Sequence, residues 1–488
     1  MIRRLGTALL ALAILSAPAA AQSDTDDEVV EAASEHSSGR DPDPDYVRPF
    51  VLELVFLLAG TVWYWVDRDK NAVDWDFDSW TQRFDRSAFR YDNNAFSVNW
   101  TFHPLSGSAY YGFARANDLH PGWSFTYAFL TSFAWEWLLE FKERVSINDQ
   151  IATPVGGMVL GEFFYKVSRF LHVNATTRAR RAAAWSLGLG VQANEAIDGH
   201  RPTQAERDAL HARFHLGYGG ALLSAGGERA GLHTVDFEGR IVEMPGWHEP
   251  RELRRAFGNA NVTRLRARAT RGPGGGGFEL DGDTIVTGLH VQSLDESGGG
   301  SALVGAALGY SYRRVDYEDF SDAVGAVHLP GFALDTMLRR PSAELRFLFR
   351  AHPDFASADA TLAYDAWALD HPDARAKTIL EREGYFYGWG ATTWAELELE
   401  LGPVELGMRA SFSRWLSDEG LDRSQEVVTD DVEVESRRVS MSSWARVQLP
   451  RSVHLELRYD ELRRWDWVGG YGERGRLRRV GLSVGVTR

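Results

Sequence analysis

The sequence has 488 residues, of which 44% are hydrophobic and 25% are charged, and its net charge is −15. This composition excludes a chain that is disordered throughout and a protein built mainly from apolar membrane-spanning helices. The lack of cysteine excludes disulfides, thiolate catalysis and Cys-ligated metal centres, and the acidic balance argues against nucleic acid as a partner.

The N-terminus has the pattern of a secretory signal peptide. Two arginines precede an apolar run from Leu5 to Leu15, and small residues follow at Ala19 to Ala21. We therefore expect residues 1–21 to be a signal peptide and the protein to be exported. Residues 22–46 are acidic and rich in Ser and Pro, which predicts a disordered linker.

Residues 47–180 are predicted to form a helical module. The apolar run Phe50 to Val66 carries Glu53, which favours a helix buried against protein over a membrane span, because an inward carboxylate needs a polar partner. A second helix is predicted to begin at Ser146 and to continue to about residue 171, with a kink or break near Pro154.

Four motifs in this module occur in combination. They are HPxxGxxYY from His103, SFxWE from Ser132, SxND from Ser146 and TPxGGxxxGE from Thr153. With these motifs, residues 50–175 resemble the bacterial domain-of-unknown-function family 3943. The resemblance implies an exported protein of Gram-negative type and brings no activity with it.

Several polar residues lie in apolar, aromatic surroundings within these motifs. One hypothesis is a catalytic site or a metal site, since carboxylates in apolar surroundings tend to have raised pKa values or to bind cations; its candidates are His103, Glu136, Asp149 and Glu162. The alternative is a structural polar network, which would also contain Arg115, Glu140, Asn148 and Thr153. Because a single His among carboxylates is a weak zinc signal, no metal site and no cofactor is predicted.

Residues 181–488 change to an alternation of apolar and polar residues, as in Val453 to Tyr459. The predicted strands are longer than is usual in soluble proteins, and rows of charge at Glu396 to Glu400 and at Arg264, Arg266 and Arg268 suit the inside of a barrel. A soluble sandwich would use the same alternation. We predict an α+β protein in which the helical module precedes an antiparallel barrel of about 12 strands of the outer-membrane type.

Three functions remain open from the sequence. The favoured one is a non-catalytic protein of the cell outer membrane whose helical module plugs the barrel or docks envelope partners. The others are an envelope hydrolase or transferase acting on lipid or glycan, and a substrate-specific transporter or channel. The expected partners are outer-membrane lipid and an envelope protein, with no nucleic acid.

Overall fold

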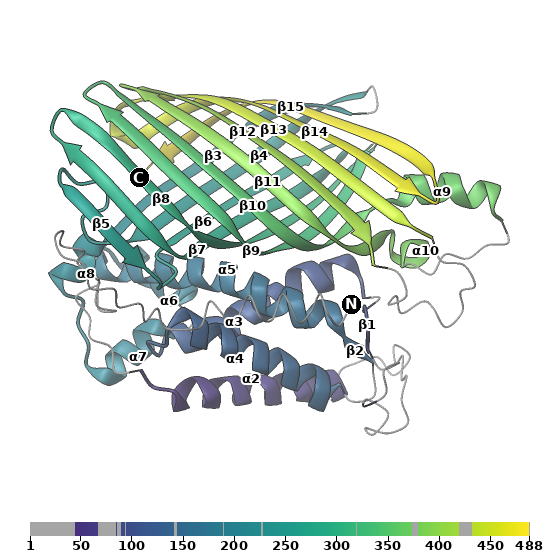
Figure 1. Ribbon diagram of the computed structural model, residues 1–488, viewed down its shortest axis with the longest axis horizontal. Helices are drawn as coiled ribbons and strands as arrows, with labels where there is room; N and C mark the ends of the chain where they lie inside the picture. The colour runs from purple at the N-terminus through teal and green to yellow at the C-terminus, as the bar shows by residue number, and fades with distance from the viewer. Residues whose placement is uncertain are drawn as a thin grey trace, which may run out of the picture.

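A computed structural model describes residues 44–66, 84, 89–92, 94–140, 144–188, 190–225, 228–318, 320–372, 379–418 and 432–487. The predicted signal peptide and all but the last three residues of the predicted linker lie outside these ranges. The described chain forms a helical module and a β-barrel that lie side by side (Figure 1).

The helical module contains seven of the described helices: α2 (Val47–Val66), α3 (His103–Arg115), α4 (Pro121–Ala134), α5 (Ile147–Val173), α6 (Arg178–Leu187), α7 (Val191–Asp198) and α8 (Gln204–Ala209). π-Helical turns precede α3 (Val98–Phe102) and follow α4 (Trp135–Leu139), and β1 (Phe89–Arg90) pairs in parallel with β2 (Val145–Ser146). None of the described helices combines the length and the hydropathy that crossing a bilayer requires.

The helix predicted to begin at Ser146 is confirmed as α5, with Ser146 as its N-cap residue. It continues past Pro154 as one helix, so the predicted break is wrong. Glycines allow α3 to approach it closely, since a methyl group on Gly157 would lie 2.4 Å from the carbonyl carbon of Gly107. This contact between two backbones fixes α3 against α5.

The long helices form two parallel pairs, α3 with α5 and α2 with α4. His103 and Arg115, near the two ends of α3, lie beside Asp149 and Glu162 of α5, so α3 and α5 run the same way. The α2 helix runs parallel to α4, because Tyr46 contacts Trp123 and Tyr64 contacts Trp135.

Twelve antiparallel strands form a closed barrel in sequence order, and β15 pairs with β3 to complete the ring. The strands are β3 (Leu210–Ala225), β4 (Glu228–Glu243), β6 (Val262–Gly272), β7 (Gly275–Asp295), β8 (Gly298–Tyr317), β9 (Phe320–Arg340), β10 (Ala343–Asp359), β11 (Tyr385–Leu401), β12 (Val404–Ser417), β13 (Val434–Gln448), β14 (Val453–Val468) and β15 (Tyr471–Thr487). Strand β5 (Glu252–Phe257) pairs only with β7, in line with β6. The predicted fold class and strand number are confirmed.

The barrel begins at Leu210, whereas the sequence placed its boundary at residue 181. Residues 178–209 form α6, α7 and α8 instead, and α8 starts with a capping box between Thr203 and Glu206. The sequence did not predict these helices because they are short and carry no long apolar stripe.

Strand residues alternate between a charged lumen and an apolar outside. Leu406, Leu455 and Leu457 are exposed on the outer surface, while their neighbours Glu405 and Glu456 are buried inside. Apolar outside and charged inside is the arrangement of a barrel that lies in lipid. The protein is an outer-membrane β-barrel.

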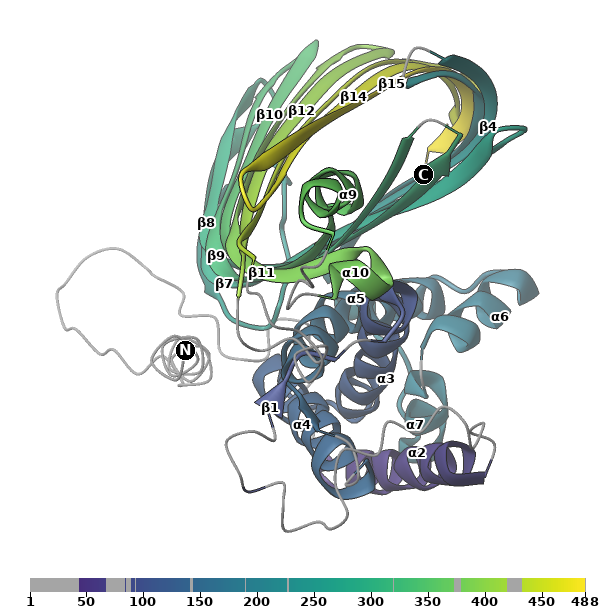
Figure 2. The same cartoon turned by 90° about the vertical axis from the view of Figure 1, so that its right-hand side faces the viewer.

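The two ends of the barrel differ. Tight hairpins occur at both ends, as at Arg340 to Ala343 where β3 begins and at Gly272 to Gly275 at the other end, and the β4–β6 connection at the first end carries β5. At the other end, the β10–β11 connection carries α9 (Thr361–Asp370) and α10 (Leu380–Glu383). Figure 2 shows α9 end-on within the outline of this mouth. Short periplasmic turns and longer outer loops are typical of outer-membrane barrels.

The helical module lies outside the barrel, against the wall that runs from β4 to β11 (Figures 1 and 2). Three outward-facing glycines receive its side chains: Gly325 faces Trp100, Gly282 faces Val159 and Gly239 faces Phe163. The hypothesis that the helical module plugs the barrel is therefore wrong. Close glycine contacts and a shared hydrophobic core join the module to the barrel wall instead.

Candidate functional site

Two of the four candidate residues are neighbours at one end of the module. The Nε2 atom of His103 lies 3.6 Å from Oδ1 of Asp149. Glu136 is fully buried nearby, and its Oε2 accepts a hydrogen bond from the backbone N–H of Ser146 at 3.1 Å. These side chains come from α3, α5 and the π-helical turn after α4.

Burial shifts the ionisation of this group of residues. It raises the pKa of Glu136 well above the usual range, and the carboxylates of Glu140 and Asp149 raise it further. Burial also lowers the pKa of His103. Glu136 therefore tends to be protonated and His103 neutral, so the pair lacks the charges expected of a carboxylate–imidazolium couple.

An amide and two arginines lie beside the other polar residues at this end of the module. Asn148 accepts from the backbone N–H of Asp92 at 2.7 Å and donates to Asp149 at 2.8 Å. Glu136 and Glu140 share a small hollow with two arginines, Arg90 and Arg144.

Glu162 belongs to a different group. Its carboxylate accepts hydrogen bonds from Tyr111 at 2.5 Å and from Nε of Arg115 at 2.8 Å, and Nζ of Lys166 lies 3.4 Å away. Asp149 is 13 residues earlier on α5, which places it about 20 Å away along the helix axis. The four candidates therefore do not form one site.

The Glu162 group continues into the barrel. Lys166 donates to Glu243 of β4 at 2.7 Å, and Arg169 donates to the same carboxylate at 2.6 Å and to Glu206 of α8 at 3.2 Å. All six ionic side chains of this chain are buried, and three cations balance three anions. Such a compensated chain fastens the module to the barrel.

Thr153, the last residue of the predicted network, is buried where α5 meets Gly107 of α3. It takes no part in either group. Arg115, Asn148 and Glu140 do lie in polar groups, so the structure divides the single predicted network into two.

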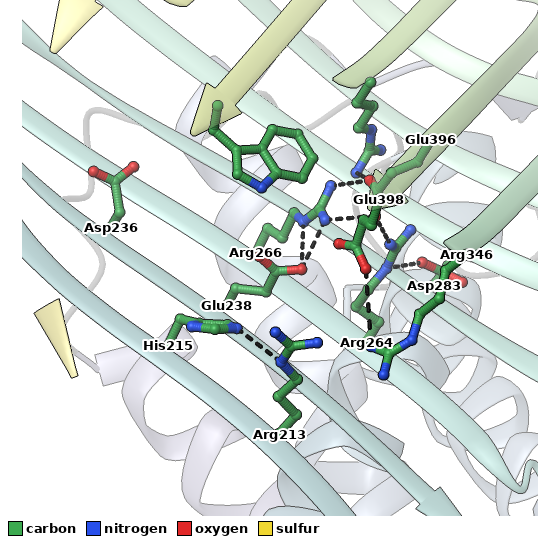
Figure 3. A network of polar contacts seen from close by, with 12 residues as sticks. Arg213, His215, Asp236, Glu238, Arg264, Arg266, Asp283, Arg346, Glu396 and Glu398 are labelled. Carbon is green, nitrogen blue, oxygen red and sulfur yellow. Dashed lines mark hydrogen bonds and ion pairs between the residues drawn. The ribbon is translucent and has the colours of Figure 1, made fainter. Parts of the chain in front are cut away.

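A third charged network fills the lumen (Figure 3). Arg264 and Arg266 of β6 both donate to Glu396 of β11, with a distance of 3.0 Å for Arg264. Strands β6 and β11 are five strands apart in a ring of twelve, so this contact joins nearly opposite walls. The predicted opposition of the two charge rows is confirmed for these residues.

Similar bridges occur along the lumen. Side chains on strands distant in the ring form ion pairs that join Arg213 with Glu405 at 2.6 Å, Arg268 with Asp460 at 2.7 Å, Arg479 with Glu279 at 2.6 Å, Arg438 with Asp322 at 3.1 Å and Arg464 with Asp359 at 3.2 Å. Figure 2 shows the flattened cross-section that brings opposite walls together. Direct side-chain contacts between walls narrow the lumen at these levels.

A cavity of about 180 Å³ lies in the lumen, and its lining includes residues of the bridges such as Arg268, Asp460 and Arg438. Both signs of charge line it, including Arg409, Arg458, Asp281 and Glu456. At the mouth, α9 packs through Tyr364 and Trp367 in a hydrophobic cluster with Trp415 and Val468.

One group of carboxylates in the described residues has the spacing of a metal site: Glu238, Glu396 and Glu398 in the lumen. Arginines already occupy it, since Arg266 contacts both Glu238 and Glu396, and Arg346 lies 3.9 Å from Glu398. This donor set is neutralised by guanidinium groups and does not fit a resident cation.

The comparisons with known proteins bear on the module first. Residues 88–191 match the family model described as "Domain of unknown function (DUF3943)". The resemblance drawn from the motifs is confirmed, over a window that starts and ends later than residues 50–175. The DUF3943 region contains all eight candidate residues, whereas Glu206 and Glu243 of the second polar group lie outside it.

The search of curated proteins gave no match. Among solved structures, the translocator domain of the autotransporter NalP from Neisseria meningitidis is 13% identical, with a TM-score of 0.23; the match covers 62% of this chain and 96% of that one. The NanC porin is 9% identical, with a TM-score of 0.24 and coverage of 55% and 98%. The beta domain of the Bordetella autotransporter Brka is 11% identical, with a TM-score of 0.22 and coverage of 57% and 99%.

Sequence reasoning missed the partners that join regions far apart in the chain. It found Glu162 and Arg115, but not Glu243, which is 77 residues after Lys166 and on the barrel. It also missed the outward glycines of β4, β7 and β9. A glycine at an outward position of a long strand, where an aliphatic residue is usual, is the signal that could have indicated a protein contact.

Proposed function

We propose that this protein is a closed, non-catalytic barrel that holds the DUF3943 module in place at the outer membrane. Its role would be structural or docking, and solutes would not diffuse through it. The contact of Arg264 and Arg266 with Glu396 across the lumen is the observation that carries this proposal.

The burial of the ion pairs across the lumen supports a closed barrel. Each bridge joins charges that are largely removed from water, and breaking one would leave a buried charge without compensation. Opening the lumen would require several bridges to separate together. An open pore would therefore be a high-energy state of this barrel.

The module offers little support for an envelope hydrolase. Catalysis needs the acid, the base and the reacting atoms within hydrogen-bond reach of one another. His103 and Asp149 are separated from Glu162 by about half the length of α5, and Glu162 is engaged by Arg115 and Tyr111.

A second candidate is a gated path for a small polar solute. The charged cavity of about 180 Å³ favours it, since a pore-lining surface of Arg and acidic residues sets charge preference. This candidate requires the bridges that line the cavity to open.

Conductance in planar bilayers tests the proposal. Purified full-length protein whose folding is verified by a heat-dependent shift in gel mobility should give no stable steps above the bare lipid. The double variant Arg266→Ala and Glu396→Ala removes the carboxylate that both β6 arginines contact, and we expect frequent channel openings from it.

Leu457→Ala is the matched control, because this outward side chain has no contact with the lumen. It should be as silent as the wild type. A steady ohmic conductance of the folded wild type would overturn the closed barrel. Openings that depend on voltage or on an added small charged solute would instead favour the gated path.

A further inference from the structure

The outer face of α2 is apolar and has no protein cover among the described residues. Val51, Val55, Leu58 and Val62 recur at helical spacing on this face, and their exposed fractions lie between 49% and 62%. On α4, Trp123 and Leu130 are exposed in the same way. A contiguous apolar surface of this kind marks a contact with another apolar medium or molecule.

This face lies on the side of the module furthest from the barrel (Figure 2). The long helices run lengthwise beside the barrel wall (Figure 1). The 20 residues of α2 extend about 30 Å, which is the thickness of the hydrocarbon core of a bilayer. The apolar face is therefore long enough to match the hydrocarbon core of a bilayer.

The described part of this surface carries few charged residues. From Pro49 to Val66 the only charged residue is Glu53, which is buried and accepts a hydrogen bond from Thr131 at 2.5 Å. The α4 helix, PGWSFTYAFLTSFA, contains no Asp, Glu, Lys or Arg. At one end of α2, Arg48 forms an ion pair with Asp198 at 2.7 Å.

Aromatic residues lie near both ends of the apolar face. Tyr46 and Trp123 contact each other edge to face near the start of α2, with ring centroids 6.1 Å apart. At the opposite end, Trp137 stacks on Phe133 at 5.3 Å. Tyr and Trp collect at the two interfaces of a bilayer in this way.

The position of the module also determines what surrounds it. It covers the barrel wall from β4 to β11, while the rest of the wall exposes Leu455, Leu457 and Leu482 to lipid. Because the barrel lies in a bilayer, a body that is packed along its wall at the same height displaces lipid from that wall. The lipid then meets the outer face of that body.

We propose that acyl chains of the outer membrane cover the outer face of α2 and α4, so that the module and the barrel share one continuous lipid-facing surface. The polar groups of the module, including Glu53, Arg115 and Glu162, face protein and are shielded from the hydrocarbon. The partner is a lipid surface, and the closed lumen plays no part in this contact.

Single cysteines test the proposal in the full-length protein, because the natural chain has none. Val55→Cys and Leu58→Cys place a thiol on the α2 face, where the native side chains are 59% and 56% exposed. Leu457→Cys is the matched lipid-facing control at 55% exposure, and Ala182→Cys on α6 is an exposed control at the polar end. Each variant is reconstituted in vesicles that contain phospholipids brominated in mid-chain.

A fluorescent label on the α2 sites should be quenched by the bromines as strongly as a label on Leu457→Cys. A charged thiol reagent in water should modify the α2 sites at least about ten-fold more slowly than Ala182→Cys, because the reactive thiolate does not form away from water. Rapid aqueous modification without bromine quenching would overturn the proposal. Protection from both reagent and bromine, or a disulfide between two copies at Val55→Cys, would show a protein on this face and would overturn it as well.

Discussion

The barrel has a covered wall, from β4 to β11, against which the helical module packs, and a bare wall, which the module leaves uncovered. Both walls point non-polar side chains outward, yet they use different residues. On the covered wall, Gly239, Gly282 and Gly325 lie under helix side chains, and Tyr310 donates its hydroxyl to the backbone carbonyl of Trp100. On the bare wall, aliphatic residues such as Leu457 are more than half exposed. The alternation alone therefore does not distinguish a protein contact from a lipid contact.

The difference follows from the two environments. Lipid tails adapt to any apolar shape, so the bare wall needs only bulk and hydrophobicity. A helix is rigid and close-packed, so the covered wall needs space for each side chain and a partner for each buried polar group. Glycine supplies the space and tyrosine supplies the hydrogen bond.

The largest effect should come from breaking the ion-pair chain at the covered wall. Lys166→Met leaves Glu243 with one cation fewer in a buried site, and we expect a loss of about 3 to 5 kcal/mol in unfolding free energy. Denaturant unfolding of the full chain in micelles measures it. The double variant with Glu243→Gln should cost less than the sum of the single changes; simple additivity would show that the two residues are not coupled.

A charge on the bare wall should have the next largest effect. Leu457→Arg places a guanidinium on the lipid side of the wall, at a cost of about 2 to 4 kcal/mol if it lies near the middle of the bilayer. Assembly into the membrane should fall, as measured by the heat-modifiable fraction. Leu457→Ala is the control, and normal assembly of the arginine variant would indicate that protein covers this wall too.

A methyl group at a glycine on the covered wall should cost less. At Gly325 it would lie 2.1 Å from the Trp100 ring, so the helix must shift, and overpacking of this kind costs about 1 to 3 kcal/mol. Gly325→Ala should lower the unfolding midpoint of the full chain. Gly231→Ala is the matched control, because a methyl group there meets nothing within 4 Å. Equal effects of both changes would mean that the glycine conformations matter and the helix contact does not.

The smallest effect should be a pH dependence at the polar end of the module. Burial raises the pKa of Glu136 above its unfolded value, so its contribution to stability is greatest at low pH and is lost as the pH rises toward the folded pKa. Glu136→Gln cannot ionise, so its stability relative to wild type should increase from pH 5 to pH 8, by at most about 1.4 kcal/mol per pH unit. A constant difference across this range would show that Glu136 does not titrate differently in the folded state.

Local patterns made the barrel and the long helices predictable. Alternation along Val453 to Tyr459 depends only on which side of one strand is apolar, and the start of α5 depends on residues near Ser146. The position of the module was not predictable, because it depends on pairs such as Trp100 with Gly325 and Lys166 with Glu243. These pairs join residues separated by 225 and 77 positions, and nothing in either local sequence identifies the partner.

The candidate site was predictable only as a set of residue types. Apolar surroundings correctly indicated that Glu136 and Glu162 are buried. Their grouping failed because the motifs place Asp149 and Glu162 on one helix, and a helix separates residues by 1.5 Å for each position. The lumen bridges were foreseen as opposed rows of charge, since strands of alternating polarity must direct their charges to a common interior.

The contact surface between the module and the barrel imposes an order of assembly. Phe163 rests on Gly239 of β4, whereas Asn99 donates to the hydroxyls of Tyr385 and Tyr387 on β11. The module is synthesised before any of these strands, yet its complete binding surface exists only after β4 to β11 are in register. The helices must therefore wait for most of the barrel, and docking them becomes a late step that requires contacts between distant parts of the chain.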